Sequence, residues 1–247
     1  MPAVTVSGVR RVLDAAEISP GGLVVDLGGG ASALSLPALA RVGPSGVVCA
    51  VDSASGGGGA PDGVRRVVAE AGRLPFADGA VQAVIGHTVQ VDVAGVLGDA
   101  ARVLAPEGKL SLGQPLPHYR RHDVLAGLTA AEQWRADTAI LQAVPARLRH
   151  ATDDLAAAIY PYGACLAVDS FAVVPETVIL RDQDSVAEFL RMPLYPGVSR
   201  PMDMVRDQLG DVFAARYEAA WYVTLRQRRT IAVSTPTVFV GARRGLP

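Results

Sequence analysis

The feature that most constrains the fold is a short apolar run that ends in an acidic residue and three glycines. Residues 23–30 read LVVDLGGG. An apolar run without alternation is typical of a strand that is buried on both faces of a parallel sheet. The glycines allow a tight turn and a close approach of a ligand to the backbone at the carboxyl edge of the sheet. The run therefore predicts a parallel α/β sheet with a binding crevice that begins at Asp26.

Strand and helix patterns continue to alternate up to about residue 113. A second buried strand is expected at residues 47–51, further strands at 64–69, 80–86 and 109–113, and helices at 7–18, 31–42 and 91–104. Strands that alternate with helices in this way form β-α-β units. The pattern therefore predicts a doubly wound parallel sheet.

The pattern changes after the breaker cluster QPLP at residues 114–117. Helical patterns follow at 125–148, 152–160, 185–191 and 202–216, and strand patterns at 171–180 and 230–240. No internal repeat is visible. We expect one domain over residues 1–247, with a helical lid or insertion at about 115–160.

Charge at the first strand end discriminates between nucleotide ligands. Gly28-x-Gly30-x-x-Ala33 matches the dinucleotide fingerprint, but Asp26 would repel a pyrophosphate held at this turn. S-adenosylmethionine has an ammonium and a sulfonium and no phosphate, so it suits an acidic side chain here. Asp52 ends the second strand, where ribose hydroxyls of either cofactor would donate to it. Asp26 thus favours S-adenosylmethionine over a nicotinamide dinucleotide.

Four segments in register carry a family resemblance: VVDLGGGAS (24–32), AVD (50–52), VVAEAGRLPFADGAVQAVI (67–85) and ARVLAPEGKLSL (101–112). They resemble the successive motifs of class I S-adenosylmethionine-dependent methyltransferases, in particular the UbiE/type-11 small-molecule group. The resemblance covers about residues 8–113, and 114–229 match no motif. It implies a Rossmann-like α/β fold with a seven-stranded sheet, mostly parallel, whose antiparallel last strand is 230–243.

The resemblance also implies a cofactor site along the strand ends. Asp26, Gly28 and Gly30 would surround the methionine portion of S-adenosylmethionine. His87, which follows the fourth strand, would lie where the pocket meets the methyl donor. S-adenosylhomocysteine would be the product that remains.

The nucleoside end of the cofactor would be bound at the next two strands. Asp52 would accept hydrogen bonds from both ribose hydroxyls, and Ser53 would lie beside the adenine. Glu70 would accept from the adenine amino group, and Ala71 would offer its backbone amide to the ring. The helix usual after the strand-two acid is replaced by residues 55–59, SGGGG. We expect a neighbouring subunit of a homodimer, or the segment 115–150, to cover the sheet edge that this leaves open.

Methyl transfer from a sulfonium depends mainly on alignment, and an acceptor with a proton to lose also gains from a base. Among four histidines, His87 is the strongest candidate base, and a packed histidine is the alternative. His118 is a weaker candidate, as is His122. The two cysteines lack metal-ligand spacing, and no metal site is expected.

Aromatic residues concentrate in the part of the chain that matches no motif. Tyr119, Trp134 and Tyr160 are candidates to bind an apolar, planar acceptor, and Tyr162, Trp221 and Tyr222 lie in the same half. Core packing explains the same residues equally well, so both interpretations stay open.

Composition excludes several classes of partner. The net charge is −1 and no dense basic block occurs, which disfavours nucleic acid. No apolar run reaches the ~20 residues that span a bilayer, and the N-terminus lacks a signal-peptide pattern. Two cysteines make no disulfide framework. A cytoplasmic protein with a small-molecule partner and no membrane partner is expected.

The leading functional prediction is S-adenosylmethionine-dependent methyl transfer to a small molecule, such as a secondary metabolite in natural product biosynthesis. One alternative is a cyclase or other non-methylating enzyme that keeps the cofactor pocket. Another is a catalytically silent binding subunit. A nicotinamide-dependent dehydrogenase is disfavoured by Asp26.

Overall fold

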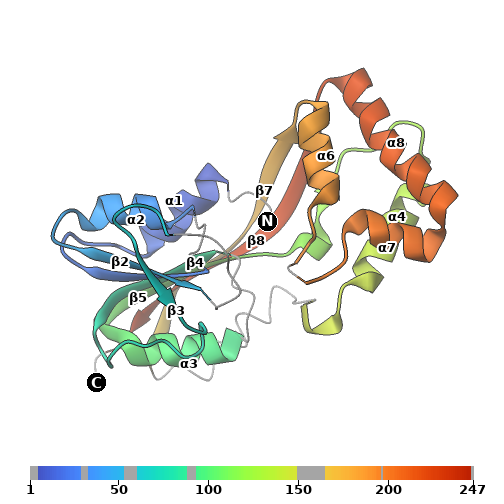
Figure 1. Cartoon of the computed structure of the whole chain (residues 1–247). Coiled ribbons are helices and arrows are strands. Elements are labelled where there is room, and N and C mark those ends of the chain that lie inside the picture. Colours follow the sequence, from blue (N-terminus) through green and yellow to red (C-terminus); the bar gives the residue numbers. More distant parts are fainter. Residues whose placement is uncertain are drawn as a thin grey trace. The chain divides into compact units, whose positions relative to one another are not determined.

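The described residues of this computed structural model are 5–28, 33–52, 60–87, 93–148, 165–195 and 197–245, and they fall into two compact units. The sheet unit comprises Val6–Pro115, Ala151–Val174 and Thr237–Pro247. The helical unit comprises Met1–Thr5, Leu116–His150 and Pro175–Pro236. Figure 1 shows the strands of the first and the helix group of the second. The expected lid at about 115–160 stays a prediction, and residues 149–164 lie outside the described ranges.

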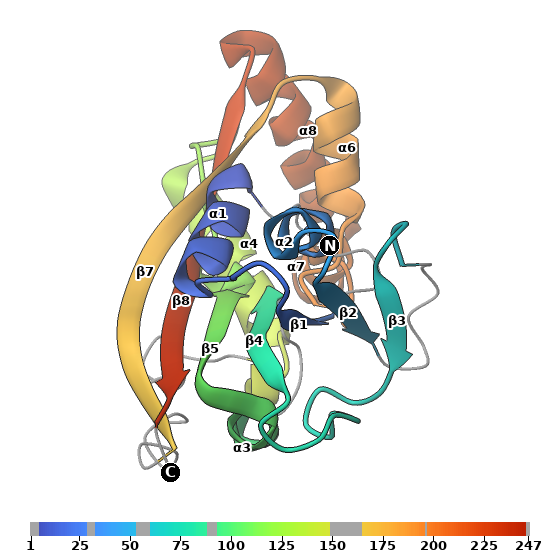
Figure 2. The same cartoon turned by 90° about the vertical axis from the view of Figure 1, so that its left-hand side faces the viewer.

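Eight strands form one sheet in the order β3-β2-β1-β4-β5-β8-β6, with β7 paired to β8 (Figure 2). Their bounds are β1 Leu23–Leu27, β2 Val47–Asp52, β3 Arg65–Val68, β4 Val81–His87, β5 Leu104–Pro115, β6 Arg121–His122, β7 Leu166–Leu180 and β8 Ile231–Arg244. Neighbours from β3 to β5 are parallel, and β8 is antiparallel to β5 and β6. The predicted mostly parallel α/β sheet with an antiparallel last strand is confirmed. The strand beyond the seven expected is β6, whose two residues are too few to show a pattern.

Helices cover both faces of the parallel strands (Figure 1). The helices α1 (Val6–Ala15) and α2 (Ser35–Val42) lie on one face, and α3 (Val93–Val103) lies on the other. Their apolar sides pack onto the strands because parallel strands need both faces covered. One core cluster of this unit is made of Val12, Leu13, Ala16, Val24, Leu34, Ala38, Val42, Val48, Ala50, Val64, Ala83, Ile85 and Phe239.

The edge strand β3 is poorly covered. Arg65, Arg66 and Val68 are exposed, and the described residues between β2 and β3, 60–64, form no helix. The glycine-rich residues 53–59 lie outside the described ranges. It stays a prediction that another subunit, or the segment 115–150, covers this edge.

The helical unit contains α4 (Ala130–Ala143), α6 (Gln183–Arg191), α7 (Pro201–Leu209) and α8 (Asp211–Arg228), with short 3-10 turns at Pro117–Tyr119 and Ala146–Leu148. A capping box starts α4, because the side chains of Thr129 and Glu132 each accept a hydrogen bond from the backbone amide of the other residue. The single helix expected at 202–216 was wrong. Gly210, with φ +85°, separates α7 from α8 because that backbone conformation ends a helix. The helix expected at 152–160 lies outside the described residues.

The core of the helical unit is centred on aromatic and aliphatic side chains of α8. Trp221 is the largest fully buried side chain among those described. Its cluster contains Leu125, Ala136, Leu180, Val186, Leu190, Met202, Val205, Ala214, Tyr217, Ala220, Trp221, Leu225, Ile231 and Val233. Within the described ranges, every helix is too short or too polar to cross a membrane.

Candidate functional site

The carboxyl end of β1 holds a buried carboxylate. Asp26 is 0% exposed, and the Ser35 hydroxyl at the start of α2 donates to Asp26 Oδ2 over 2.5 Å. A helix N-terminus favours negative charge, and Ser35 is the first residue of α2. Gly28 has φ +78°, and its amide donates to the Val51 carbonyl over 2.9 Å. A Cβ on Gly28 would contact nothing within 4 Å, so the backbone conformation is what requires glycine here.

Two more carboxylates follow the neighbouring strands. Asp52 is the last residue of β2 and is partly buried, and its carbonyl accepts from the Ala69 amide over 3.1 Å. Glu70 follows β3 and is exposed, and Ala71 beside it is partly buried. Because β1, β2 and β3 are parallel neighbours, their acidic ends share one edge of the sheet. Gly30 and Ser53 lie outside the described residues.

His87 ends β4 in a packed position. Its side chain is buried, and it is paired in register with Gly113 of β5. A Cβ on Gly113 would lie 2.7 Å from His87 Cδ2 and 3.1 Å from the Phe239 ring. The missing side chain at Gly113 therefore makes room for the imidazole. Its assignment as base and as cofactor neighbour stays a prediction.

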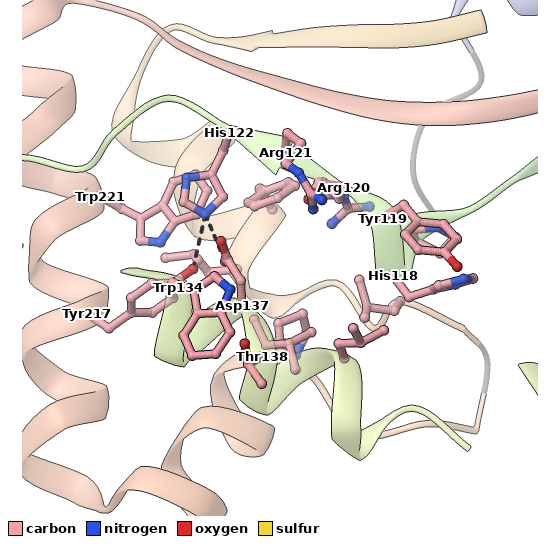
Figure 3. Close-up of a pocket in the computed structure, with 17 residues that line it drawn as sticks. His118, Tyr119, Arg120, Arg121, His122, Trp134, Asp137, Thr138, Tyr217 and Trp221 are labelled. Carbon is pink, nitrogen blue, oxygen red and sulfur yellow. Dashed lines mark hydrogen bonds and ion pairs between the residues drawn. The ribbon is translucent and has the colours of Figure 1, made fainter. Parts of the chain in front are cut away.

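The helical unit contains a cavity of about 310 Å³ (Figure 3). The segment Pro117–His122 lines one side of it, and α4 lines the opposite side. The full lining is Pro117, His118, Tyr119, Arg120, Arg121, His122, Trp134, Asp137, Thr138, Ile140, Leu141, Phe189, Leu190, Leu194, Pro201, Tyr217 and Trp221. Most of these side chains are aromatic or aliphatic, and the polar ones come chiefly from Pro117–His122. Such a lining is typical of a small-molecule site.

A hydrogen-bonded histidine lies at one end of the cavity. His122 Nε2 is 3.3 Å from Asp137 Oδ1 and 3.3 Å from the Tyr217 hydroxyl, as the dashed lines of Figure 3 mark. Its Nδ1 is 2.8 Å from the Asp123 carbonyl, and its ring lies 4.5 Å from that of Trp221. Burial is the main reason why the pKa of Tyr217 lies above its ordinary value. The phenol therefore stays protonated at neutral pH.

The other end of the cavity is formed by His118 and Tyr119 (Figure 3). His118 is buried, and its Nδ1 is 2.9 Å from the hydroxyl of buried Tyr195. The rings of His118 and Tyr119 are 4.4 Å apart. Burial raises the pKa of Tyr195 as well, so this second phenol is also neutral.

Between these ends, Arg120 lines the cavity (Figure 3). Its Nε donates to the Thr235 hydroxyl over 3.2 Å, and its guanidinium carbon lies 4.9 Å from the Phe189 ring centroid. Burial lowers the pKa of Arg120 to about 10, and the nearby Tyr195 and Tyr217 offset this only in part. Arg120 is therefore charged at neutral pH in poorly hydrated surroundings.

Comparison with known proteins gives one relative in sequence. No family model matches the chain. Nocamycin O-methyltransferase from Saccharothrix syringae is 32% identical over 126 residues. That match takes in 44% of this chain and 43% of the relative, so the chain aligns with less than half of that protein.

Solved structures match over nearly the whole chain. Geranyl diphosphate C-methyltransferase from Streptomyces coelicolor A3(2), in complex with Mg²⁺, geranyl diphosphate and S-adenosyl-L-homocysteine, matches with 16% identity and a TM-score of 0.54. That match covers 96% of this chain and 78% of the other. The chain has the class I methyltransferase fold. The cyclase SpnF shares this fold, with 14% identity, a TM-score of 0.50, and coverage of 97% of this chain and 82% of the other.

On this methyltransferase fold, the predicted site residues divide between the two units. Asp26, Gly28, Asp52, Glu70 and Ala71 lie in the sheet unit at the ends of β1 to β3. His118, Tyr119 and Trp134 line the cavity of the helical unit, and Tyr119 and Trp134 are 39% and 68% exposed. Tyr160 lies outside the described residues. The assignments themselves stay predictions. Among the described residues no cluster of acidic, histidine or cysteine side chains could hold a metal ion.

Several cavity residues were not singled out from the sequence, among them Asp137, Phe189 and Tyr217. Asp137 sits in α4, fifteen positions after the histidine that it contacts, and Phe189 and Tyr217 come from α6 and α8. No local spacing links such distant positions. The one available signal was the run HYRRH at 118–122, where two histidines and two arginines follow the fifth strand directly.

Proposed function

We propose that this chain transfers a methyl group from S-adenosylmethionine to a small organic acceptor. The observation that carries the proposal is Asp26, a fully buried carboxylate at the end of β1 on a methyltransferase fold. When bound, the cofactor supplies an electrophilic methyl group on its sulfonium. Three acidic residues at adjacent strand ends suit this cationic nucleoside and disfavour a pyrophosphate.

The residues proposed to hold the cofactor have complementary chemistry. Asp26 and the backbone at Gly28 would bind the methionine portion, with Gly30 contributing from the same loop. Asp52 would accept from the ribose hydroxyls, with Ser53 beside the adenine. Glu70 would accept from the adenine amino group, and the Ala71 amide would donate to the ring.

The acceptor is proposed to bind in the cavity of the helical unit. Its volume of about 310 Å³ lies at the lower end of the range for small-molecule sites, about 300–1,000 Å³. Tyr119 and Trp134 line it, and Tyr160 is proposed to contribute. The name of the nocamycin relative supports an acceptor from natural product biosynthesis. His87, or more weakly His118, would take the proton of an acceptor that has one to lose, an effect worth roughly 10²–10⁴-fold in rate.

The test is an assay with methyl-labelled S-adenosylmethionine and a panel of small phenols, amines and carboxylic acids. The proposal expects S-adenosylhomocysteine and a labelled product in equal amounts by mass spectrometry. The matched control is the Asp26→Asn variant, which should form much less of both at the same cofactor concentration. Failure of the protein to bind S-adenosylhomocysteine would refute the proposal outright.

Product analysis also separates methyl transfer from the alternative, because SpnF is a cyclase on the same fold. A cyclase would convert a candidate substrate to an isomer of the same mass and release no S-adenosylhomocysteine. Binding of the cofactor without any conversion would favour the silent binding subunit.

A further inference from the structure

Arg120 is a partly buried cation that lines the cavity and has no counter-ion in the described part of the chain. Among the described residues, its one side-chain hydrogen bond goes to the neutral Thr235 hydroxyl, over 3.2 Å. No carboxylate of the described residues lies within ion-pair distance of it. Its neighbour Arg121, by contrast, is exposed to solvent. A charge taken out of water without a partner is costly, so such a group is retained where it binds something.

The side chains that interact with Arg120 do not neutralise it. Tyr195 and Tyr217 are the two side chains with a favourable electrostatic effect on its charge, and burial keeps both phenols protonated. Phe189 offers the guanidinium only the face of its ring, at 4.9 Å. The positive charge therefore remains available to a ligand in the cavity that Arg120 lines.

The rest of the lining indicates what the ligand carries besides a negative charge. Buried Trp221 and Tyr217 and exposed Trp134 surround the cavity with rings. Flat apolar molecules pack well against such rings. Asp137 lines the same cavity, and its repulsion grows with the negative charge of the ligand, which favours a ligand with a single negative charge.

We propose that the acceptor is a planar apolar molecule with one carboxylate, and that Arg120 binds this carboxylate inside the cavity. The inference rests on the proposed function because it assigns the cavity to the acceptor. A guanidinium presents paired N–H donors that match the two oxygens of a carboxylate. Arg120 would thus select the substrate class and orient the acceptor.

Calorimetric titration of the full chain with matched naphthyl probes tests the proposal. The probes are 2-naphthoate, its neutral isostere 2-naphthamide, and 2-naphthyl phosphate. Because a hydrogen bond to a charged group is the stronger kind, naphthoate should bind about 10- to 100-fold more tightly than naphthamide. It should also bind more tightly than the phosphate.

Two neighbouring arginines provide the matched variants. Arg120→Gln should reduce the preference for naphthoate over naphthamide to about threefold or less. Arg121→Gln removes the same charge one residue away, at an exposed position of the same lining, and should keep the preference. Arg120→Lys keeps the charge without the paired donors and should keep an intermediate preference. Each ratio compares the affinities of one protein for naphthoate and naphthamide. The ratio for the wild-type protein tests the proposal without any variant.

The outcomes separate this inference from the proposed function. Equal binding of naphthoate and naphthamide, no binding of naphthoate, tighter binding of the phosphate, or loss of the preference in Arg121→Gln alone would each overturn the inference. S-adenosylhomocysteine is titrated into the same preparations. Normal binding of S-adenosylhomocysteine with no charge preference would overturn the inference and leave methyl transfer standing. A charge preference without any binding of S-adenosylhomocysteine would instead overturn methyl transfer, leaving Arg120 as an anion site.

Discussion

The acidic strand ends of the sheet unit and the cavity of the helical unit are built in different ways. Asp26, Asp52 and Glu70 are each placed by the strand at whose carboxyl end they lie, so a few adjacent residues determine each position. The cavity is lined from five separate stretches between Pro117 and Trp221, and its contacts include one between residues 95 positions apart, His122 and Tyr217. A site at strand ends is thus encoded locally, whereas the cavity depends on the packing of a whole helix group.

The largest expected effect comes from removing the centre of the helical unit. Trp221→Ala deletes a fully buried indole and should lower the free energy of unfolding by about 3–5 kcal/mol. Urea unfolding followed by circular dichroism measures it. Trp134→Ala removes the same side chain from a 68% exposed position and should cost less than about 1 kcal/mol.

The same pair of variants tests the separation of the two regions. If the strand ends are built locally, both variants should bind S-adenosylhomocysteine with affinities within about twofold, at a temperature where both are folded. A large loss of cofactor affinity in Trp221→Ala alone would show that the strand ends depend on the packing of the helical unit.

Asp26→Asn is expected to affect the acidic strand ends of the sheet unit and not the cavity of the helical unit. It keeps an oxygen to accept from Ser35 but removes the charge, and should weaken S-adenosylmethionine binding about 100-fold, or about 2.7 kcal/mol. Calorimetry measures the change, and Asp62→Asn in the exposed turn before β3 is the control. If the variant binds S-adenosylmethionine as tightly as the wild type, Asp26 is not part of the cofactor site.

A smaller effect is expected where His87 meets Gly113. Gly113→Ala places a methyl group 2.7 Å from the imidazole and should cost about 1–3 kcal/mol of stability. His87→Ala should relieve most of that cost in the double variant, since it removes the nearer of the two rings. Thermal unfolding of the four proteins gives the coupling, and strict additivity would argue against this packing.

The smallest perturbation uses the two native thiols as reporters. Burial raises the pKa of Cys49, while Cys165 is exposed. A raised pKa lowers the thiolate fraction at any pH below it, so a thiol reagent at neutral to mildly alkaline pH should label Cys165 rapidly and Cys49 only in urea. Cys49 should stay protected in Trp221→Ala, and rapid labelling there would show that the two regions unfold together.

The sequence predicted the parallel strands and the residues at their ends because those signals are local. The residues LVVD at 23–26 predicted both a buried strand and the acidic residue near its end. Conversely, the prediction of a single helix at 202–216 missed that Gly210 ends one helix. A second helix then continues to Arg228. Nothing near His122 in the sequence identified Asp137 and Tyr217 as its partners, because those contacts exist only after α4 and α8 pack together.

The central claim is that the acidic edge of the sheet binds a cationic nucleoside. Its most direct test is calorimetric titration of the full chain with S-adenosylmethionine and, separately, with the reduced nicotinamide dinucleotide. The account predicts saturable binding of S-adenosylmethionine and no heat from the dinucleotide. Tight binding of the dinucleotide, with no response to S-adenosylmethionine, would contradict it.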